Sequence, residues 1–216
     1  MPAAYEGIEI DGRPGLVMER VDGQDQLTAL SARPWNAFKI ASTLGALHAG
    51  VHEAFAPTEL PPMREVLRQR IDLALTCGLP RDLASFAHVT LDALPDGDRL
   101  CHGDVHPGNL LLGDGGPTII DWTNATRGDP TADVARAWVI LRLGSVPPTM
   151  SPVVRLGDRL VRGAFARSYS RAYRRRRPVD DALLERWTIT HAAGRVAENI
   201  DGELENLTAF LNARCR

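Results

Sequence analysis

The sequence has few cysteines, a single lysine and no long hydrophobic run. Its three cysteines, Cys77, Cys101 and Cys215, are odd in number and widely spaced, which fits neither a disulfide framework nor a zinc site. No apolar run approaches the roughly 18 residues of a membrane span, and the N-terminus carries acidic residues in place of a basic leader, so we expect a cytoplasmic protein. Lys39 is the only lysine among 25 basic residues.

The composition predicts one folded domain and indicates neither a nucleic-acid nor a membrane partner. The chain has 216 residues, of which 44% are hydrophobic and 24% charged, enough to bury a sizeable core. A net charge of -2 gives no overall field that would hold nucleic acid or an anionic membrane. The arginine run at residues 174–177, just before Pro178, is more typical of a solvated helix end than of a nucleic-acid contact.

Hydrophobic periodicity predicts mostly helices with two small hairpins. The first hairpin is expected from strands at 5–10 and 16–21 around a five-residue loop. Apolar residues at three-residue spacing predict an amphipathic helix over 34–47. The remaining elements are a second hairpin with strands at 110–112 and 118–120, and helices over 63–75, 82–94, 133–143, 154–174, from about 180, and over 203–214.

Polar residues are concentrated at the second hairpin. Residues 102–109 read H-G-D-V-H-P-G-N, and Asp121 follows twelve positions after Asn109. An Asp and an Asn five residues apart on a loop, with a second Asp after the next strand, suit phosphoryl transfer from Mg-ATP. In that scheme one Asp receives the proton of the acceptor hydroxyl, while the Asn and the second Asp hold Mg²⁺ through oxygen atoms.

These residues resemble the aminoglycoside phosphotransferase and choline kinase-like family, which is related to protein kinases. The family carries H-G-D-x-x-x-x-N and I-D-W, as residues 102–109 and 120–122 do here. The resemblance continues through G-D-P-x-x-D at 128–133 and through the Leu-His pair at 47–48. Upstream, residues 16–23 resemble the strand and hinge that join the two lobes of these enzymes.

The resemblance implies an α+β fold: a protein-kinase-like C-terminal lobe, mainly helical with a small catalytic hairpin, and a two-strand remnant of the N-terminal lobe. It implies an ATP-dependent phosphotransferase that uses Mg²⁺ and acts on a hydroxyl of a small molecule. The implied residues are Asp104 as catalytic base, Asn109 and Asp121 as Mg²⁺ ligands, the backbone of Glu19, Arg20 and Val21 as the adenine edge, and His102, His106 and Asp133 as supports. We expect Asp133 to steady the loop by hydrogen bonds.

The domain organisation that follows is a remnant and hinge at 1–22 and a C-terminal lobe at 23–216, which ends in helices over 152–216. Only 18 residues precede Glu19, and none is a lysine, so the lysine with which this family anchors the nucleotide phosphates is absent. We favour a gene start that was placed too late, with the missing lobe encoded upstream. The alternative is a natural remnant that acts as a non-catalytic kinase-like binding module.

Other patterns have simpler interpretations than a second site. His102, Asp104 and His106 alternate as metal ligands on a strand would, but the glycines and proline among them predict a loop, and a metal hydrolase would leave Asn109 and Asp121 unexplained. We expect two further histidines to serve packing because no third ligand lies nearby in sequence, and we expect four tryptophans in the core. These residues are His48 and His52, and Trp35, Trp122, Trp138 and Trp187.

The sequence does not identify the molecule that would accept the phosphoryl group. A cationic aminoglycoside would need an acidic cleft, and four acidic residues lie close together near the C-terminus. Residues 152–216 nevertheless hold 13 Arg against 8 acidic residues, a net charge of +5, which does not indicate a polycation site. The family also includes kinases for choline, homoserine, sugars and macrolides. The four acidic residues are Glu198, Asp201, Glu203 and Glu205.

Overall fold

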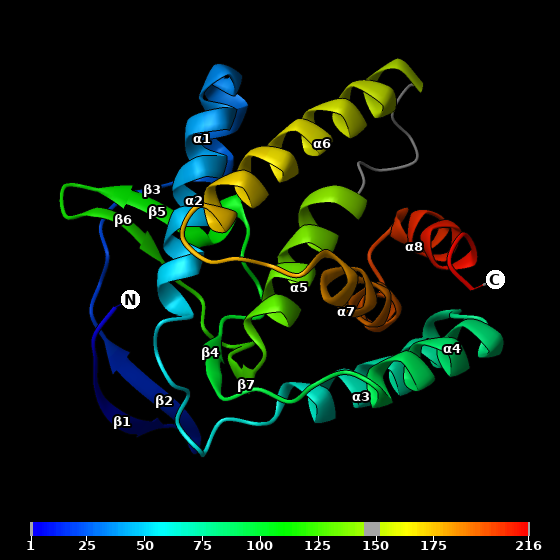
Figure 1. Ribbon diagram of the computed structural model, residues 1–216. Coiled ribbons are helices and arrows are strands. Elements are labelled where there is room, and N and C mark those ends of the chain that lie inside the picture. Colours follow the sequence, from blue (N-terminus) through cyan, green and yellow to red (C-terminus); the bar gives the residue numbers. More distant parts are fainter. Residues whose placement is uncertain (1, 145–151, 216) are drawn as a thin grey trace.

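The computed structural model describes residues 2–144 and 152–215 and is mainly helical, which confirms the predicted α+β class (Figure 1). The helices are α1 (Gln26–Ala32), α2 (Ala37–Val51), α3 (Met63–Ala74), α4 (Arg81–Asp92), α5 (Pro130–Leu143), α6 (Pro152–Arg174), α7 (Asp181–Arg195) and α8 (Glu203–Asn212). Three small antiparallel sheets pair β1 (Ala4–Ile10) with β2 (Arg13–Met18), β3 (Gln24–Asp25) with β5 (Leu110–Gly113) and β6 (Gly116–Ile119), and β4 (Arg99–Cys101) with β7 (Thr126–Gly128). Within these ranges no helix has both the length and the apolarity to cross a membrane.

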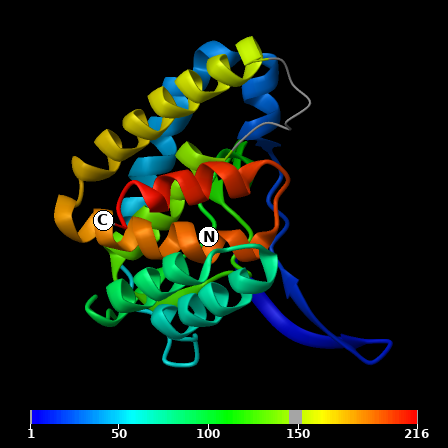
Figure 2. The ribbon, with the colours of Figure 1, turned by 90° about the vertical axis from the view of Figure 1, so that its right-hand side faces the viewer.

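Helix α5 lies between two hydrophobic cores. Its Ala132, Ala135 and Val139 belong to the core that α3, α4, α7 and α8 build, and its Val134 and Ala137 belong to the core under α2 and α6. In Figures 1 and 2, α3 and α4 run side by side below α7, while α6 crosses the opposite end of the molecule beside α2. Because α5 is covered on two faces, the residues at its N-terminus are fixed relative to both halves.

Helix α2 buries only part of the apolar spacing from which it was predicted. It begins at Ala37, after a 3-10 turn over Pro34–Asn36, and buries Ala41 and Leu44 against α6. Residues spaced by three drift round a helix by about 60° per step because a turn takes 3.6 residues. Trp35 and Phe38 therefore lie outside the buried stripe and are 73% and 64% exposed, so the expectation of a buried Trp35 is wrong.

The other three tryptophans lie at the core as expected, although to different depths. Trp187 is fully buried among α3, α4 and α7, and Trp138 and Trp122 are half-buried and pack against the core clusters. The predicted helices α3 to α8 are confirmed within a few residues at each end.

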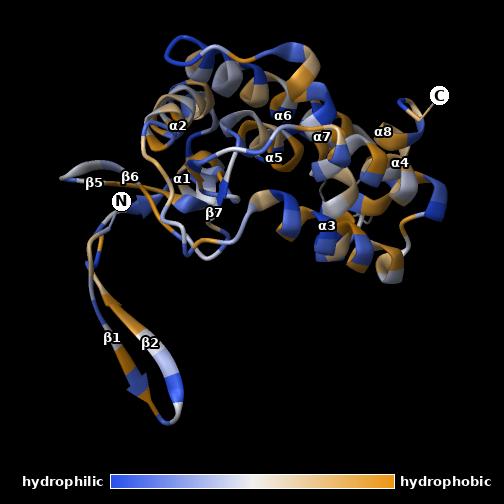
Figure 3. Ribbon diagram, turned by 60° about the horizontal axis from the view of Figure 1, so that its bottom comes forward, coloured by the Kyte–Doolittle hydropathy of each residue, from blue (hydrophilic) through white to orange (hydrophobic). Residues whose placement is uncertain are grey.

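The β1–β2 hairpin has a tighter turn than predicted. Ile10 pairs with Arg13 across a two-residue turn, in which Asp11 and Gly12 adopt φ of 51° and 74°. Asp-Gly is a preferred sequence for such turns because both central residues need positive φ. The predicted five-residue loop is therefore wrong, and the hairpin projects away from the rest of the molecule (Figure 3).

The sequence did not reveal α1 or the β4–β7 pair. Each of these strands has only three residues, too few to show an alternating pattern. The pair matters because β4 ends at Cys101, where the polar stretch begins, and β7 starts at Thr126, a few residues after Asp121. The segment that carries the polar loop and Asp121 therefore begins and ends at this short sheet.

Candidate active site

The β5–β6 hairpin brings two predicted site residues together. Asn109 comes directly before β5 and Asp121 two positions after β6, and the register pairs Leu110 with Ile119. The N–H of Ile120 donates to the carbonyl of Asn109 at 3.0 Å. Because the start of β5 and the end of β6 are neighbours in an antiparallel pair, Asn109 and Asp121 lie at the same end of the hairpin.

Asp104 and Asn109 are in direct contact. The Asn109 Nδ2 donates to the backbone oxygen of Asp104 at 2.9 Å and to its carboxylate Oδ2 at 3.1 Å. Both bonds use the nitrogen, so the Asn109 Oδ1 has no hydrogen bond within residues 2–144 and 152–215. The exposed Asp121 carboxylate accepts one bond, from the Thr123 hydroxyl at 2.7 Å. These two oxygen-bearing groups fit Mg²⁺, which prefers hard oxygen ligands and keeps several waters.

Asp121 also has an unusual backbone. Its φ is 63°, in the left-handed region that residues with a Cβ rarely adopt. Strain of this kind is often found at functional sites, where the surrounding structure holds a side chain in a required direction.

The carboxylate of Asp104 is ionised at neutral pH. Its partial burial raises the pKa, but His106, Arg136 and Asn109 outweigh that effect and hold the pKa below its ordinary value. The His106 Nε2 lies 3.5 Å from the Asp104 Oδ2, and an Arg136 Nη2 lies 4.0 Å from the Oδ1. An anionic Asp104 can accept a hydrogen bond from an approaching hydroxyl group.

Asp133 holds the loop from below. It is fully buried at the N-terminus of α5, and its carboxylate accepts bonds from the N–H of His102 at 2.5 Å and of Gly103 at 2.9 Å. Burial raises the pKa of Asp133, but the charge and hydrogen bonds of His48 and His52 outweigh that effect and hold the pKa well below its usual range. Gly103 has φ of 78°, and a Cβ there would lie 2.4 Å from the Asn124 oxygen, so the loop requires glycine at this position.

Comparisons with known proteins show the family of the chain. The profile of the APH family, described as the phosphotransferase enzyme family, matches residues 1–179. The chain belongs to this family. A search of curated proteins by sequence gives no match.

Solved structures show the fold of the phosphotransferase family over the whole chain. A thermostable aminoglycoside phosphotransferase APH(4)-Ia, in a complex with ADP and hygromycin B, aligns with 100% of this chain and 75% of its own at a TM-score of 0.62 and 15% identity. A glucosamine kinase bound to glucosamine, ADP and phosphate aligns with 100% of this chain and 63% of its own at a TM-score of 0.58 and 21% identity. An amicoumacin kinase in complex with AMP-PNP, Ca²⁺ and Ami aligns with 97% of this chain and 68% of its own at a TM-score of 0.61 and 17% identity. The implied kinase-like fold is confirmed, and the chain spans less than two thirds of the glucosamine kinase.

The three residues of the expected adenine edge lie between β2 and β3. The N–H of Glu19 donates to the carbonyl of Ala3 at 2.7 Å, so this donor is already used. Arg20 is exposed and pairs with Asp22 at 2.9 Å, while Val21 is half-buried. Within the described residues, the Glu19 carbonyl and the backbone groups of residues 20–21 make no backbone hydrogen bond, so these groups of the expected edge remain.

His102 is not available to a metal. Its Nδ1 accepts from the N–H of Asp104 at 3.2 Å and its Nε2 donates to the carbonyl of Ile120 at 3.0 Å. Burial lowers its pKa, in keeping with a neutral ring that uses one nitrogen as donor and the other as acceptor. His106 turns its Nδ1 to the N–H of Gly108 at 3.1 Å. The hydrolase interpretation needs His102 as a metal ligand, and both nitrogens of its ring are already used by these bonds.

His48 and His52 do have a third partner, which the sequence did not reveal. Their Nε2 atoms lie 2.9 Å and 3.2 Å from the Asp133 Oδ2, and their Nδ1 atoms lie 2.6 Å from the hydroxyls of Tyr169 and Tyr173. The three side chains have the arrangement of a possible metal cluster. All four ring nitrogens, however, have hydrogen-bond partners, so the packing role that we expected accounts for both histidines.

Sequence reasoning missed Arg136. Its Nε donates to the carbonyl of Gly103 at 3.1 Å, its guanidinium forms an ion pair with Glu198, and the residue is buried, with 3% of its surface exposed. A signal was present: Arg136 follows Asp133 by three positions in an otherwise apolar helix, so both face the same way.

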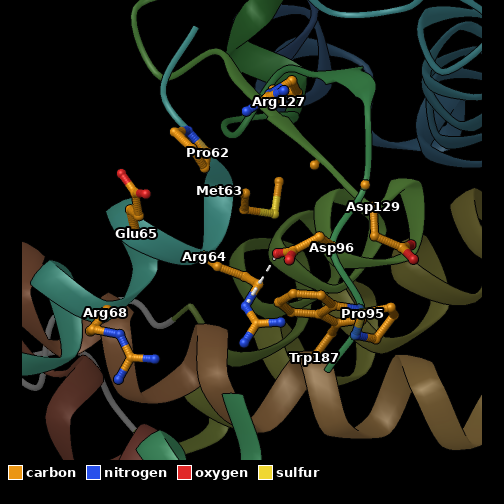
Figure 4. Close-up of a pocket in the computed structure, with 12 residues that line it drawn as sticks. Pro62, Met63, Arg64, Glu65, Arg68, Pro95, Asp96, Arg127, Asp129 and Trp187 are labelled. Carbon is orange, nitrogen blue, oxygen red and sulfur yellow. Dashed lines mark ion pairs between the residues drawn. The ribbon is translucent and has the colours of Figure 1, made fainter. Parts of the chain in front are cut away.

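Two hollows flank this part of the fold. One, of about 410 Å³, lies between the start of α3 and the loop after α4, and the Arg64–Asp96 ion pair of 3.3 Å crosses it (Figure 4). Neither Asp104 nor the predicted metal ligands line it. The other, of about 340 Å³, is lined by Asp104 together with Arg136 and Glu198. Only the second hollow adjoins the polar loop.

Proposed function

We propose that the protein is an ATP-dependent phosphotransferase that phosphorylates a hydroxyl group of a small molecule. The observation that carries the proposal is the contact between Asp104 and Asn109, with Asp121 held beside Asn109 by the β5–β6 hairpin. A base and two oxygen ligands within one small structure are what phosphoryl transfer requires from the protein.

In this proposal Asp104 orients the acceptor hydroxyl and takes its proton as the phosphoryl group is transferred. The Asn109 Oδ1 and the Asp121 carboxylate would hold Mg²⁺, which supplies charge neutralisation for the phosphates of ATP when bound. Arg136 and Asp133 act as positioning residues, because both bond the backbone of Gly103 next to Asp104. Residues 19–21 are proposed as the adenine edge, with the free backbone groups at 20–21.

The first test is a titration of the chain with ATP, with and without Mg²⁺, followed by thermal stability. A ligand that binds only the folded state raises the melting temperature according to its concentration and its dissociation constant. We expect stabilisation that depends on Mg²⁺ and that Asn109→Ala removes. The absence of any shift at millimolar Mg-ATP would contradict the proposal for this chain.

The second test measures phosphate transfer from ATP to a panel of hydroxylated compounds. Asp104→Asn should abolish transfer while leaving the melting temperature and Mg-ATP binding nearly unchanged, because the amide keeps the shape of the side chain but cannot accept a proton. Transfer at the wild-type rate in this variant would remove Asp104 from its proposed role.

A second candidate function is a non-catalytic kinase-like binding module. The observation that favours it is the placement of Lys39, the only lysine, which lies exposed on α2 and after the expected adenine edge. ATP binding without transfer to any acceptor would support this candidate.

A further inference from the structure

The hollow beside Asp104 is built around a carboxylate whose charge is already neutralised. The Glu198 Oε2 accepts from Arg195 at 2.9 Å, and its Oε1 forms an ion pair with Arg136 and lies 3.9 Å from an Arg70 Nη1. Three guanidinium groups thus surround one carboxylate. Because both of its oxygens are used, Glu198 cannot offer a free anion to a ligand in the hollow.

The other acidic residues near the C-terminus do not restore a negative field there. Glu203 is buried and gives both of its oxygens to Arg195, at 2.6 Å and 3.0 Å. Asp201 and Glu205 are exposed and do not line the hollow. The acidic sequence cluster that would suit a cationic acceptor is therefore either paired with arginine or located elsewhere.

Arg70 is the cation in the hollow with hydrogen-bonding capacity to spare. Its side chain is 28% exposed, whereas that of Arg136 is 4% exposed. One Nη2 donates to the Asn124 Oδ1 at 2.6 Å, and the 3.9 Å separation from Glu198 is too long for a hydrogen bond. Its Nε–H, its Nη1 hydrogens and the second Nη2 hydrogen are thus left to bind a ligand. A guanidinium matches a carboxylate by two parallel bonds, either from Nε and Nη2 or from Nη1 and Nη2.

We propose that the acceptor is a hydroxylated compound that carries a carboxylate, with the carboxylate bound by Arg70 and the hydroxyl presented to Asp104. This inference rests on the proposed phosphotransferase function for the role of Asp104, but the charge preference of the hollow does not depend on nucleotide. A polycationic acceptor is disfavoured because it would meet Arg70 and Arg136, and the two acids that line the hollow, Asp104 and Glu198, already face basic groups.

Three probes with the same carbon skeleton test the charge preference: gluconate, sorbitol and glucamine, which are anionic, neutral and cationic at pH 7. Their binding to the full chain is measured by calorimetry without nucleotide. We expect gluconate to bind about tenfold more tightly than sorbitol, the gain of a hydrogen-bonded charge pair, and glucamine to bind more weakly than either. Equal or tighter binding of glucamine, or no binding of gluconate, would overturn the inference.

Variants assign the effect to Arg70. Arg70→Gln should remove the preference for gluconate over sorbitol, and Arg70→Lys should retain part of it, because lysine keeps the charge without the fork. Arg81→Gln, at an exposed position at the start of α4, is the matched control and should change nothing. An unchanged preference in folded Arg70→Gln would contradict the role of Arg70.

Failure of the broader proposal has a different signature. If gluconate binds but Mg-ATP neither binds nor transfers phosphate to it, the phosphotransferase proposal fails while the charge preference of the hollow stands. If Mg-ATP binds and phosphate is transferred only to neutral or cationic compounds, the carboxylate inference fails and the phosphotransferase proposal stands.

Discussion

The polar loop at 102–109 and the β1–β2 hairpin are held by opposite means. The loop is fixed by buried side chains from distant parts of the chain, above all by Asp133, which accepts four hydrogen bonds. The hairpin is held mainly by its own ladder, and its Tyr5, Ile10 and Leu16 are 66%, 59% and 59% exposed. The comparison teaches that the rigidity of the candidate site comes from the helices beneath it and not from the strands that precede it.

Of the substitutions that test this difference between the loop and the hairpin, Asp133→Ala is expected to have the largest effect on stability. The substitution leaves two loop N–H groups and two buried histidines without their acceptor, at a cost of about 3–5 kcal/mol in the free energy of unfolding. Urea unfolding at pH 7 measures the loss. Asp22→Ala, which removes an exposed ion pair with Arg20 next to the hairpin, is the control and should cost less than about 1 kcal/mol. Equal losses in the two variants would contradict the contrast.

The same contrast explains what the sequence could predict. The spacing of Asp104, Asn109 and Asp121 is local, since all three lie on one loop and hairpin, so the candidate site could be proposed from the order of residues alone. The supports are not local. Asp133 is 85 positions from His48, and Arg136 is 62 positions from Glu198, so no pattern in one stretch could pair them.

The errors in the predicted fold have similar physical causes. Apolar side chains at Trp35 and Phe38 fit a helical stripe, but only packing against α6 decides which stripe of α2 is buried. The turn at Asp11-Gly12 needed positive φ at both residues, a signal that was present and that the predicted five-residue loop overlooked.

A smaller loss of stability is expected when a side chain is added at the close contact between α2 and α6. A Cβ on Gly45 would lie 2.3 Å from the backbone oxygen of Tyr169, so Gly45→Ala must push the helices apart, at about 1–3 kcal/mol of unfolding free energy. Gly50→Ala, on the same helix with nothing within 4 Å, is the matched control and should stabilise by roughly 0.5–1 kcal/mol. Thermal unfolding of both variants checks the difference, and a stable Gly45→Ala would show that this packing is looser than described.

A lower pH should reduce the stability of the helices beneath the loop. Burial lowers the pKa of His52 to about 4 and that of His191 to about 3, from 6.5 when unfolded. Between pH 6.5 and 4 the unfolded state binds protons that the folded state does not, so the melting temperature should fall by several degrees as the pH drops through this range. Asp133, with a lowered pKa, contributes only to the loss below about pH 4.

His52→Gln should flatten this pH dependence, because one of the groups that titrate on unfolding is removed. Melting temperatures at pH 7.5, 6.0 and 5.0 measure the slope in the wild type and the variant. A slope that does not change would show that His52 is protonated to the same extent in both states.

The smallest effect is expected in the hairpin, and a pair of leucines sharpens the comparison. Leu16 is 59% exposed on β2, whereas Leu44 is fully buried between α2 and α6. Leu16→Ala should change the free energy of unfolding by no more than about 0.5 kcal/mol, whereas Leu44→Ala should cost about 2–5 kcal/mol. Urea unfolding at several protein concentrations checks both. The free energy lost in Leu16→Ala could exceed that lost in Leu44→Ala only at high protein concentration. That result would show that a second molecule covers the hairpin in solution and that Leu16 is exposed only in the isolated chain.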